Sequence, residues 1–221
     1  MALSAAASDK VVTIGLAPNR PETGFGYLEC ERPTGLQPVR RFVEKPDLAT
    51  AKQYLESGTY LWNSGMFFFS ARRLLAEIDH HLPALGKLLT EIGQAPDRAS
   101  ALYPLAPSTS IDYGVMEKLE AGTVFVVPAE FGWNDVGSWS ALFDIAPHGT
   151  GGNVNPDAHV VVDSARNVLY ANGKQIIAAV GVSDLVIVAT EDAVLVMPRD
   201  RAQDVRHVVS ALKEKQRDDL L

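Results

Sequence analysis

The sequence contains a single cysteine, Cys30, in 221 residues. This excludes an intramolecular disulfide and a zinc site built from several thiolates, and it is consistent with a reducing compartment. No apolar run approaches the roughly 18 residues of a transmembrane helix. The first ten residues, MALSAAASDK, have neither a basic leader nor a long apolar stretch, so they do not resemble a secretory signal. We therefore expect a cytoplasmic protein without a membrane partner.

The sequence is also poor in positive charge. It has 20 lysine and arginine residues against 27 aspartate and glutamate residues, a formal net charge of -7. A nucleic-acid partner is not expected, because no basic stripe is present to contact a phosphate backbone. A few local cations could still hold one phosphorylated small molecule.

Apolar and charged residues occur in ordinary amounts, 47% and 21% of the chain. Such a composition favours a folded globular protein over a disordered one. The length suits one large domain or one domain with a small appendage.

Strand-like and helix-like segments alternate over residues 1–148. The predicted strands are 10–16, a run ending at Cys30, 38–46, 66–70 and 123–130, and the predicted helices are 47–58, a segment capped by Ser70, and 110–122. Lys45 precedes a proline, which favours extended backbone there. The alternation predicts an α/β fold with a mixed sheet, in which ligands bind beyond the carboxyl ends of the strands.

The pattern changes over residues 149–221, after a Gly-, Pro- and Asn-rich stretch, 147–157, that we interpret as a linker. Five short apolar runs follow, and the pair Asn172-Gly173 predicts a hairpin between two of them. The last helix should begin with a capping box formed by Asp200 and Gln203. We expect two domains, 1–148 and 149–221, the second a small β meander closed by a helix.

Several polar motifs fall at the predicted strand ends. In PETGFGY, residues 21–27, Gly24 and Gly26 let the main chain approach a ligand, and Glu22 could hydrogen-bond it. In FVEKP, residues 42–46, Glu44 could accept hydrogen bonds from sugar hydroxyls and Lys45 could neutralise a phosphate. In each case an ordinary turn or a solvated ion pair remains the alternative.

Two further motifs carry amide and carboxylate groups. Asn63 in WNSGM offers both a donor and an acceptor, although turn asparagines are common. Asp135 lies in FGWNDVGSW, where it is either a structural acceptor in a turn or an oxygen ligand for Mg²⁺. Trp133 and Trp139 are interpreted as packing residues. Asp112 in SIDYGVMEK needs no ligand, because the first turn of a helix favours a carboxylate.

Taken in order, these motifs resemble those of the mannose-1-phosphate guanylyltransferase family. The matching stretches are VVTIGLAPNRPETGFGYLE, VRRFVEKP, WNSGMFFF, SIDYGVMEK, WNDVGSW and LVIVATEDAVLVMPRDRAQDV. The resemblance runs from about Lys10 nearly to the C-terminus. It implies a partial Rossmann-like nucleotidyltransferase domain followed by the small β unit.

The resemblance also implies an activity and a site. Members of the family join GTP and mannose 1-phosphate to give GDP-mannose and pyrophosphate, with Mg²⁺. Residues expected to surround the sugar phosphate are Glu22, Thr23, Gly24, Gly26, Tyr27, Glu44, Lys45 and Asn63, with Asp135 as the metal ligand. Catalysis would rest on alignment and charge neutralisation, with Lys45 and Asp135 in the catalytic roles.

The sequence departs from the family at its start. The family's glycine-rich loop, of the type GxGTRLxP, does not precede Lys10. We therefore expect the C-terminal two-thirds of the enzyme, with the GTP site largely missing and low or no activity alone.

Two other functions remain open from the sequence. One is a noncatalytic module, derived from that family, that binds a sugar phosphate or pairs with another subunit through the β unit and the last helix. The other is a sugar-processing hydrolase using two carboxylates such as Glu44 and Asp135. A homodimer is compatible with the first two readings.

Overall fold

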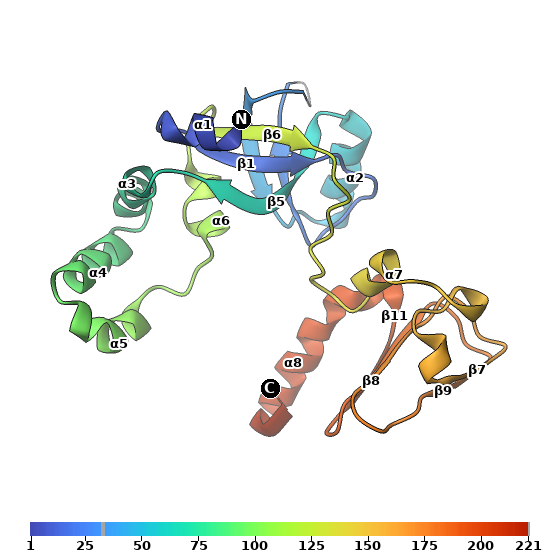
Figure 1. Ribbon diagram of the computed structural model, residues 1–221. Coiled ribbons are helices and arrows are strands. Elements are labelled where there is room, and N and C mark those ends of the chain that lie inside the picture. Colours follow the sequence, from blue (N-terminus) through green and yellow to red (C-terminus); the bar gives the residue numbers. More distant parts are fainter. Residues whose placement is uncertain (32–33, 221) are drawn as a thin grey trace. The chain divides into compact units, whose positions relative to one another are not determined.

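The computed structural model describes residues 1–31 and 34–220, and they fall into two compact units that divide between Trp133 and Asn134 (Figure 1). No helix among the described residues is both long and apolar enough to span a bilayer.

The first unit is built on a six-stranded sheet with the strand order β3-β6-β1-β5-β2-β4 (Figure 1). The strands are β1 Val11–Leu16, β2 Gly26–Glu29, β3 Gln37–Pro38, β4 Arg41–Glu44, β5 Tyr60–Phe68 and β6 Val124–Ala129. Strand β1 pairs in parallel with β6 and antiparallel with β5, and β2 pairs antiparallel with both β4 and β5. The predicted mixed sheet is therefore confirmed.

Helices connect these strands. They are α1 Ala2–Ala7, α2 Leu48–Ser57, α3 Ala71–His81, α4 Pro83–Gln94, α5 Ala99–Leu102 and α6 Ile111–Gly114. Helix α2 begins at Asp47, whose side chain accepts a hydrogen bond from the Thr50 amide at 2.8 Å, and it ends at Gly58 in the left-handed region. Ser70 caps α3 in the same way through the Arg73 amide. Both predicted helices are confirmed.

The sheet of the first unit is covered on both faces. Adjacent strand residues point to opposite faces, and Leu61 and Trp62 of β5 accordingly join two different apolar clusters. One cluster contains Leu28, Leu61 and Val126, and the other contains Tyr27, Tyr54 and Trp62. This two-sided burial fixes the strand register that positions the polar residues described below.

Three local predictions for the first unit are wrong. Strand β5 starts at Tyr60, so Asn63 lies inside a strand, beside a bulge at Gly65 where the register with β1 shifts. The predicted helix 110–122 breaks after Gly114, because Leu82 packs where a Cβ would stand and glycine is a poor helix former. Lys45 has φ 48°, not extended backbone, because the chain reverses there from β4 toward α2.

The second unit contains two small sheets and two helices. Its strands are β7 Val160–Val162, β8 Val168–Ala171, β9 Ala178–Val180, β10 Leu185–Ala189 and β11 Val194–Pro198, and its helices are α7 Ala141–Ile145 and α8 Val205–Glu214. Strands β7 and β9 form one parallel pair, and β8 pairs in parallel with β10, which pairs antiparallel with β11.

This topology is a coil rather than a meander. Val160 pairs with Ala178 and Val168 pairs with Val186, so each parallel pair joins residues 18 positions apart. The predicted hairpin at Asn172-Gly173 is wrong, because β8 and β9 lie in different sheets. Tertiary stacking therefore overrides the local turn signal, and the one hairpin of these strands joins β10 to β11.

Two other predictions for the second unit are also wrong. The stretch 147–157 is not a linker, because Asn153 and Val154 are buried in the unit. No side-chain capping bond starts α8, because a short 3-10 helix, Arg199–Asp204, precedes it and occupies the expected capping box.

Candidate functional site

The register of the first sheet brings three of the expected site residues together. Strand pairing places Gly26 opposite Glu44 and Gly15 opposite Asn63. A Cβ on Gly26 would stand 2.5 Å from Glu44 Oε2 and 3.3 Å from Asn63 Cβ. Glycine at this position therefore leaves room that a side chain would fill, between a carboxylate and an amide.

Glu44 and Lys45 form an ion pair within this site. Lys45 Nζ lies 2.9 Å from Glu44 Oε1, with the Glu44 side chain 9% exposed and that of Lys45 53% exposed. Burial raises the pKa of the Glu44 carboxyl above its ordinary value, despite the opposing effect of Lys45. The hydrogen bond to Glu44 raises the pKa of Lys45. A strained backbone at Lys45 turns its ammonium back to this carboxylate.

Asn63 lies between two partners that the sequence did not reveal as site residues. Its Oδ1 accepts a hydrogen bond from Thr13 Oγ1 at 2.9 Å, and its Nδ2 donates one to Asp112 Oδ1 at 3.3 Å. Thr13 is fully buried, and burial raises the pKa of the Asp112 carboxyl. The SIDYGVMEK segment thus contributes to the site, and not only to the start of a helix.

A third carboxylate lies near the same group. Glu117 Oε1 accepts a hydrogen bond from the Glu44 backbone amide at 2.7 Å. The site therefore holds three carboxylates, those of Glu44, Asp112 and Glu117, around a single ammonium. Such a surplus of acceptors suits the hydroxyl groups of a sugar better than it suits an anion alone.

The PETGFGY loop adjoins the site through its own internal contacts. Glu22 Oε1 accepts a hydrogen bond from the Gly24 amide at 3.0 Å, and the Tyr27 hydroxyl donates to the Glu22 carbonyl at 2.9 Å. Tyr27 is fully buried, and this burial raises the pKa of its phenol. Glu22 and Tyr27 therefore shape the loop, and Thr23 lies half-buried beside them.

Aromatic rings pack next to this loop. Phe25 makes edge contacts with Trp62 and Trp133 at centroid separations of 5.2 and 5.3 Å. Trp139 packs in the core of the second unit. The interpretation of Trp133 and Trp139 as packing residues is confirmed.

Asp135 belongs to the second unit. Its residue is exposed, and its carboxylate lies against the backbone of Gly137, where a Cβ would meet Asp135 Oδ2. No side-chain hydrogen bond to Asp135 is found within the described part of the chain, which also contains no cluster of three His, Cys, Asp or Glu residues able to hold a metal ion. An uncommitted carboxylate fits Mg²⁺, which takes one or two protein carboxylates and completes its shell with phosphates and water.

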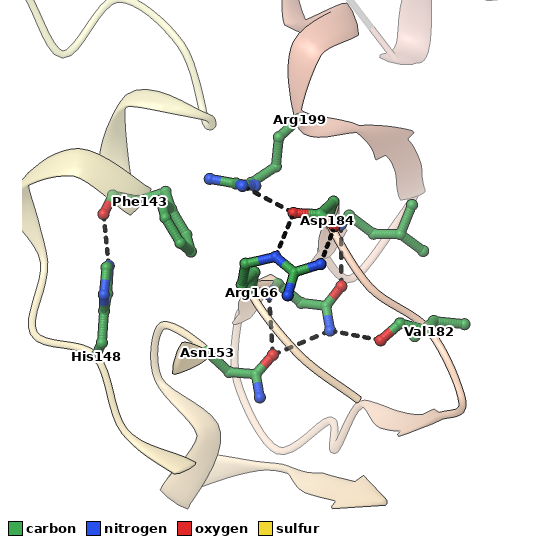
Figure 2. Close-up of polar contacts among 9 residues, drawn as sticks. Phe143, His148, Asn153, Arg166, Val182, Asp184 and Arg199 are labelled. Carbon is green, nitrogen blue, oxygen red and sulfur yellow. Dashed lines mark hydrogen bonds and ion pairs between the residues drawn. The ribbon is translucent and has the colours of Figure 1, made fainter. Parts of the chain in front are cut away.

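The second unit has its own polar cluster, shown in Figure 2. Asp184 accepts hydrogen bonds from Arg166 Nη2 at 2.6 Å and Arg199 Nη2 at 2.9 Å, and these bonds lower the pKa of its carboxyl to about 2. Buried Asn153 accepts hydrogen bonds at Oδ1 from the backbone amide and Nδ2 of Asn167. These contacts join successive turns of the coil and have a structural role.

Comparison with known proteins supports the same division. Residues 1–150 match the model of the nucleotidyl transferase family, and residues 157–212 match the MannoseP isomerase/GMP-like beta-helix domain. The β-helix description agrees with the coil of the second unit. The domain boundary between 148 and 149 stays a prediction, since the compact units divide at 133 and the two matches leave 151–156 between them.

Relatives extend the comparison along nearly the whole chain. The chain is 45% identical over 220 residues to the xanthan biosynthesis protein XanB of Xanthomonas campestris, covering 96% of this chain and 46% of that protein. It is 42% identical over 220 residues to a mannose-1-phosphate guanylyltransferase of Klebsiella pneumoniae, covering 94% and 46%. The chain thus spans about half the length of these curated relatives.

A solved structure gives the fold a close counterpart. The crystal structure of a mannose-1-phosphate geranyltransferase, so titled, from Thermus thermophilus superposes with a TM-score of 0.80 at 37% identity, covering 96% of this chain and 63% of the other. The predicted fold class, a mixed α/β nucleotidyltransferase domain with a small β unit, is confirmed. With the family model matching residues 1–150, the chain belongs to the nucleotidyl transferase family, the sugar-phosphate nucleotidyltransferases.

Proposed function

We propose that this chain supplies the sugar-phosphate side of a mannose-1-phosphate guanylyltransferase, which forms GDP-mannose and pyrophosphate from GTP and mannose 1-phosphate. The observation that carries the proposal is the convergence of Glu44, Lys45 and Asn63 on the space beside Gly26. The name of the Klebsiella relative supports the same substrate. The family assignment leaves the glycoside hydrolase hypothesis without support.

The residues divide the recognition of a sugar phosphate between them. Glu44 accepts a hydrogen bond from a sugar hydroxyl, while Lys45 gives a point charge to the phosphate. In the unliganded chain these two groups are paired at 2.9 Å, so the substrate replaces one internal contact by two external ones. The PETGFGY loop, held in shape by Glu22 and Tyr27, brings backbone amides at Thr23 and Gly24 to the same ligand.

The reaction requires little covalent chemistry from the protein. A sugar phosphate dianion is already nucleophilic at neutral pH, so the chain orients it toward the α-phosphate of GTP and neutralises its charge. Asp135 is the residue proposed to hold Mg²⁺, which when bound would neutralise charge on the phosphates. GTP and Mg²⁺ remain part of the proposal, as does a cytoplasmic location.

Binding of mannose 1-phosphate to the chain tests the proposal directly. Isothermal calorimetry should show that Lys45→Ala weakens binding by about 10- to 100-fold, the effect of losing one charge-assisted hydrogen bond. Lys52→Ala, an exposed lysine on α2, is the matched control and should bind as the wild type does. Equal losses in the two variants, or no binding by the wild-type chain, would refute the sugar-phosphate assignment.

The catalytic part needs a chain with a complete nucleotide site. In a full-length version, Asp135→Asn should abolish Mg²⁺-dependent release of pyrophosphate from GTP and mannose 1-phosphate while circular dichroism shows an intact fold. Lys45→Ala should weaken mannose 1-phosphate binding more than GTP binding. Wild-type turnover by Asp135→Asn would contradict the metal role.

A further inference from the structure

The amide of Asn63 is held in one orientation. Its Oδ1 accepts hydrogen bonds from Thr13 Oγ1 at 2.9 Å and from the Gly65 backbone amide at 3.2 Å. A backbone N–H can only donate, and an ionised carboxylate such as that of Asp112 can only accept. The contacts with Gly65 and Asp112 therefore fix which end of the amide carries oxygen and which carries nitrogen.

The same contacts determine what Asn63 can offer to a ligand. Both lone-pair positions of Oδ1 are occupied, and Asp112 takes one of the two Nδ2 hydrogens. Over residues 1–31 and 34–220, no second acceptor for Nδ2 is found. Asn63 therefore has one N–H to donate and no acceptor to spare.

Asp112 is more deeply placed than a helix terminus requires. The first turn of α6 explains a carboxylate, but not its burial against a strand residue 49 positions earlier in the sequence. Burial raises the pKa of this carboxyl, and the charged groups around it are Lys45, Glu117 and Glu44. A site that retains such a costly group beside Asn63 uses the carboxylate for that contact.

We propose that Asp112 is a positioning residue that holds Asn63 as an obligatory hydrogen-bond donor to a sugar hydroxyl. The inference rests on the proposed function and deepens it. Glu44 and Asn63 both adjoin the space left by Gly26, and Glu44 when ionised can only accept. One hydroxyl group of the sugar can thus donate to Glu44 and accept from Asn63, and such chains of hydrogen bonds strengthen one another.

Substitutions at Asp112 separate positioning from charge. In calorimetry on the chain as it exists, Asp112→Ala should weaken mannose 1-phosphate binding about tenfold, because Asn63 loses its restraint. Asp112→Asn should weaken it at most about threefold, because the new amide oxygen still accepts from Asn63 Nδ2. Binding of inorganic phosphate should change less than twofold in both variants. Asp97→Ala, an exposed acid outside the site, is the control.

A double-mutant cycle gives the decisive measurement. If Asp112 acts through Asn63, the double variant Asn63→Ala with Asp112→Ala binds no more weakly than Asn63→Ala alone. Additive losses would overturn the inference, as would a loss in Asp112→Asn equal to that in Asp112→Ala. Thermal unfolding monitored for each variant excludes misfolding as the cause.

An NMR measurement keeps this inference distinct from the proposed function. The two Asn63 side-chain amide protons should titrate with Asp112 in the unliganded wild type, and that dependence should vanish in Asp112→Asn. Should the dependence be present while mannose 1-phosphate does not bind, the proposed function fails and the positioning of Asn63 stands. If the protons ignore the ionisation of Asp112, the inference fails whatever the chain binds.

Discussion

The two units hold their polar networks in opposite ways. In the second unit, buried Asn153 donates to the carbonyls of Thr150 and Ser164 and accepts twice from Asn167, so its side chain has all four hydrogen bonds. In the first unit, Asn63 keeps one N–H without a partner in the described structure, and three carboxylates surround one ammonium.

This difference separates a structural network from a binding site. A closed network stabilises the fold, because any buried group left unpaired would cost free energy. An open network keeps carboxylates at raised pKa and leaves donors uncommitted, so its stabilisation is deferred until a ligand arrives. The following changes test the distinction, from the largest expected effect to the smallest.

Asn167→Ala should destabilise the second unit most. The substitution removes the hydrogen bonds that Asn167 makes to Asn153, to the Val182 carbonyl and to the Leu185 amide. Leaving such buried groups unpaired should lower the free energy of unfolding by about 3 kcal/mol, measured by urea denaturation. Asn172→Ala, at an exposed turn position, is the control and should change it far less. Comparable stability of the two variants would remove the structural role.

Glu44→Gln should act on binding and not on stability. Mannose 1-phosphate affinity should fall about tenfold, the effect of a weakened charge-assisted hydrogen bond. At pH 7 the free energy of unfolding should not fall, because a glutamine avoids burial of a charge. A marked loss of stability would assign Glu44 to the fold instead of to the ligand.

The pH dependence of the wild type follows from the same carboxyl groups. Burial raises the folded-state pKa of Glu44 and Asp112, so the folded chain binds more protons than the unfolded chain between their ordinary and raised values. Their contribution to stability should therefore fall as the pH rises above roughly 4. Urea denaturation at several pH values should show this fall, and the combined Glu44→Gln and Asp112→Asn variant should lack it.

Asp184→Asn should have the smallest effect. The carboxylate is largely exposed, although Arg166 and Arg199 lower its pKa to about 2. A lowered folded-state pKa gives stability that is present above roughly pH 4 and lost as the pH falls toward 2. Thermal unfolding should place the variant slightly below the wild type at pH 7, and the gap should close at pH 2. A gap that persists at pH 2 would show that the ion pairs are not its origin.

Sequence patterns predicted the parts of the fold that short-range chemistry determines. Helix α2 is defined by Asp47 at one end and Gly58 at the other, both adjacent to it. The hairpin at Asn172-Gly173 was mispredicted, because the partner of β8 lies 18 residues away and no local signal reports that stacking. Non-local pairing decides the second unit, and turn residues alone do not.

The site was predictable to a similar extent. Glu44, Lys45 and Asn63 stood out as polar residues within recognisable motifs, and the sheet register then joined Glu44 and Asn63 at Gly26. The one signal for Thr13 was a hydroxyl in an otherwise apolar strand, VVTIGL. Asp112 gave none, since the start of a helix already accounts for an acid. Asp135 and its metal stay a prediction.

The strand order of the first sheet has a consequence for biosynthesis. Strand β1 is central in space but first in sequence, and its parallel neighbour β6 begins more than 100 residues later. A nascent chain leaving the ribosome therefore holds β1 without that neighbour until Val124 has been made. Until that moment one edge of β1 lacks its neighbour, and chaperones have their main period to act on the emerging polypeptide.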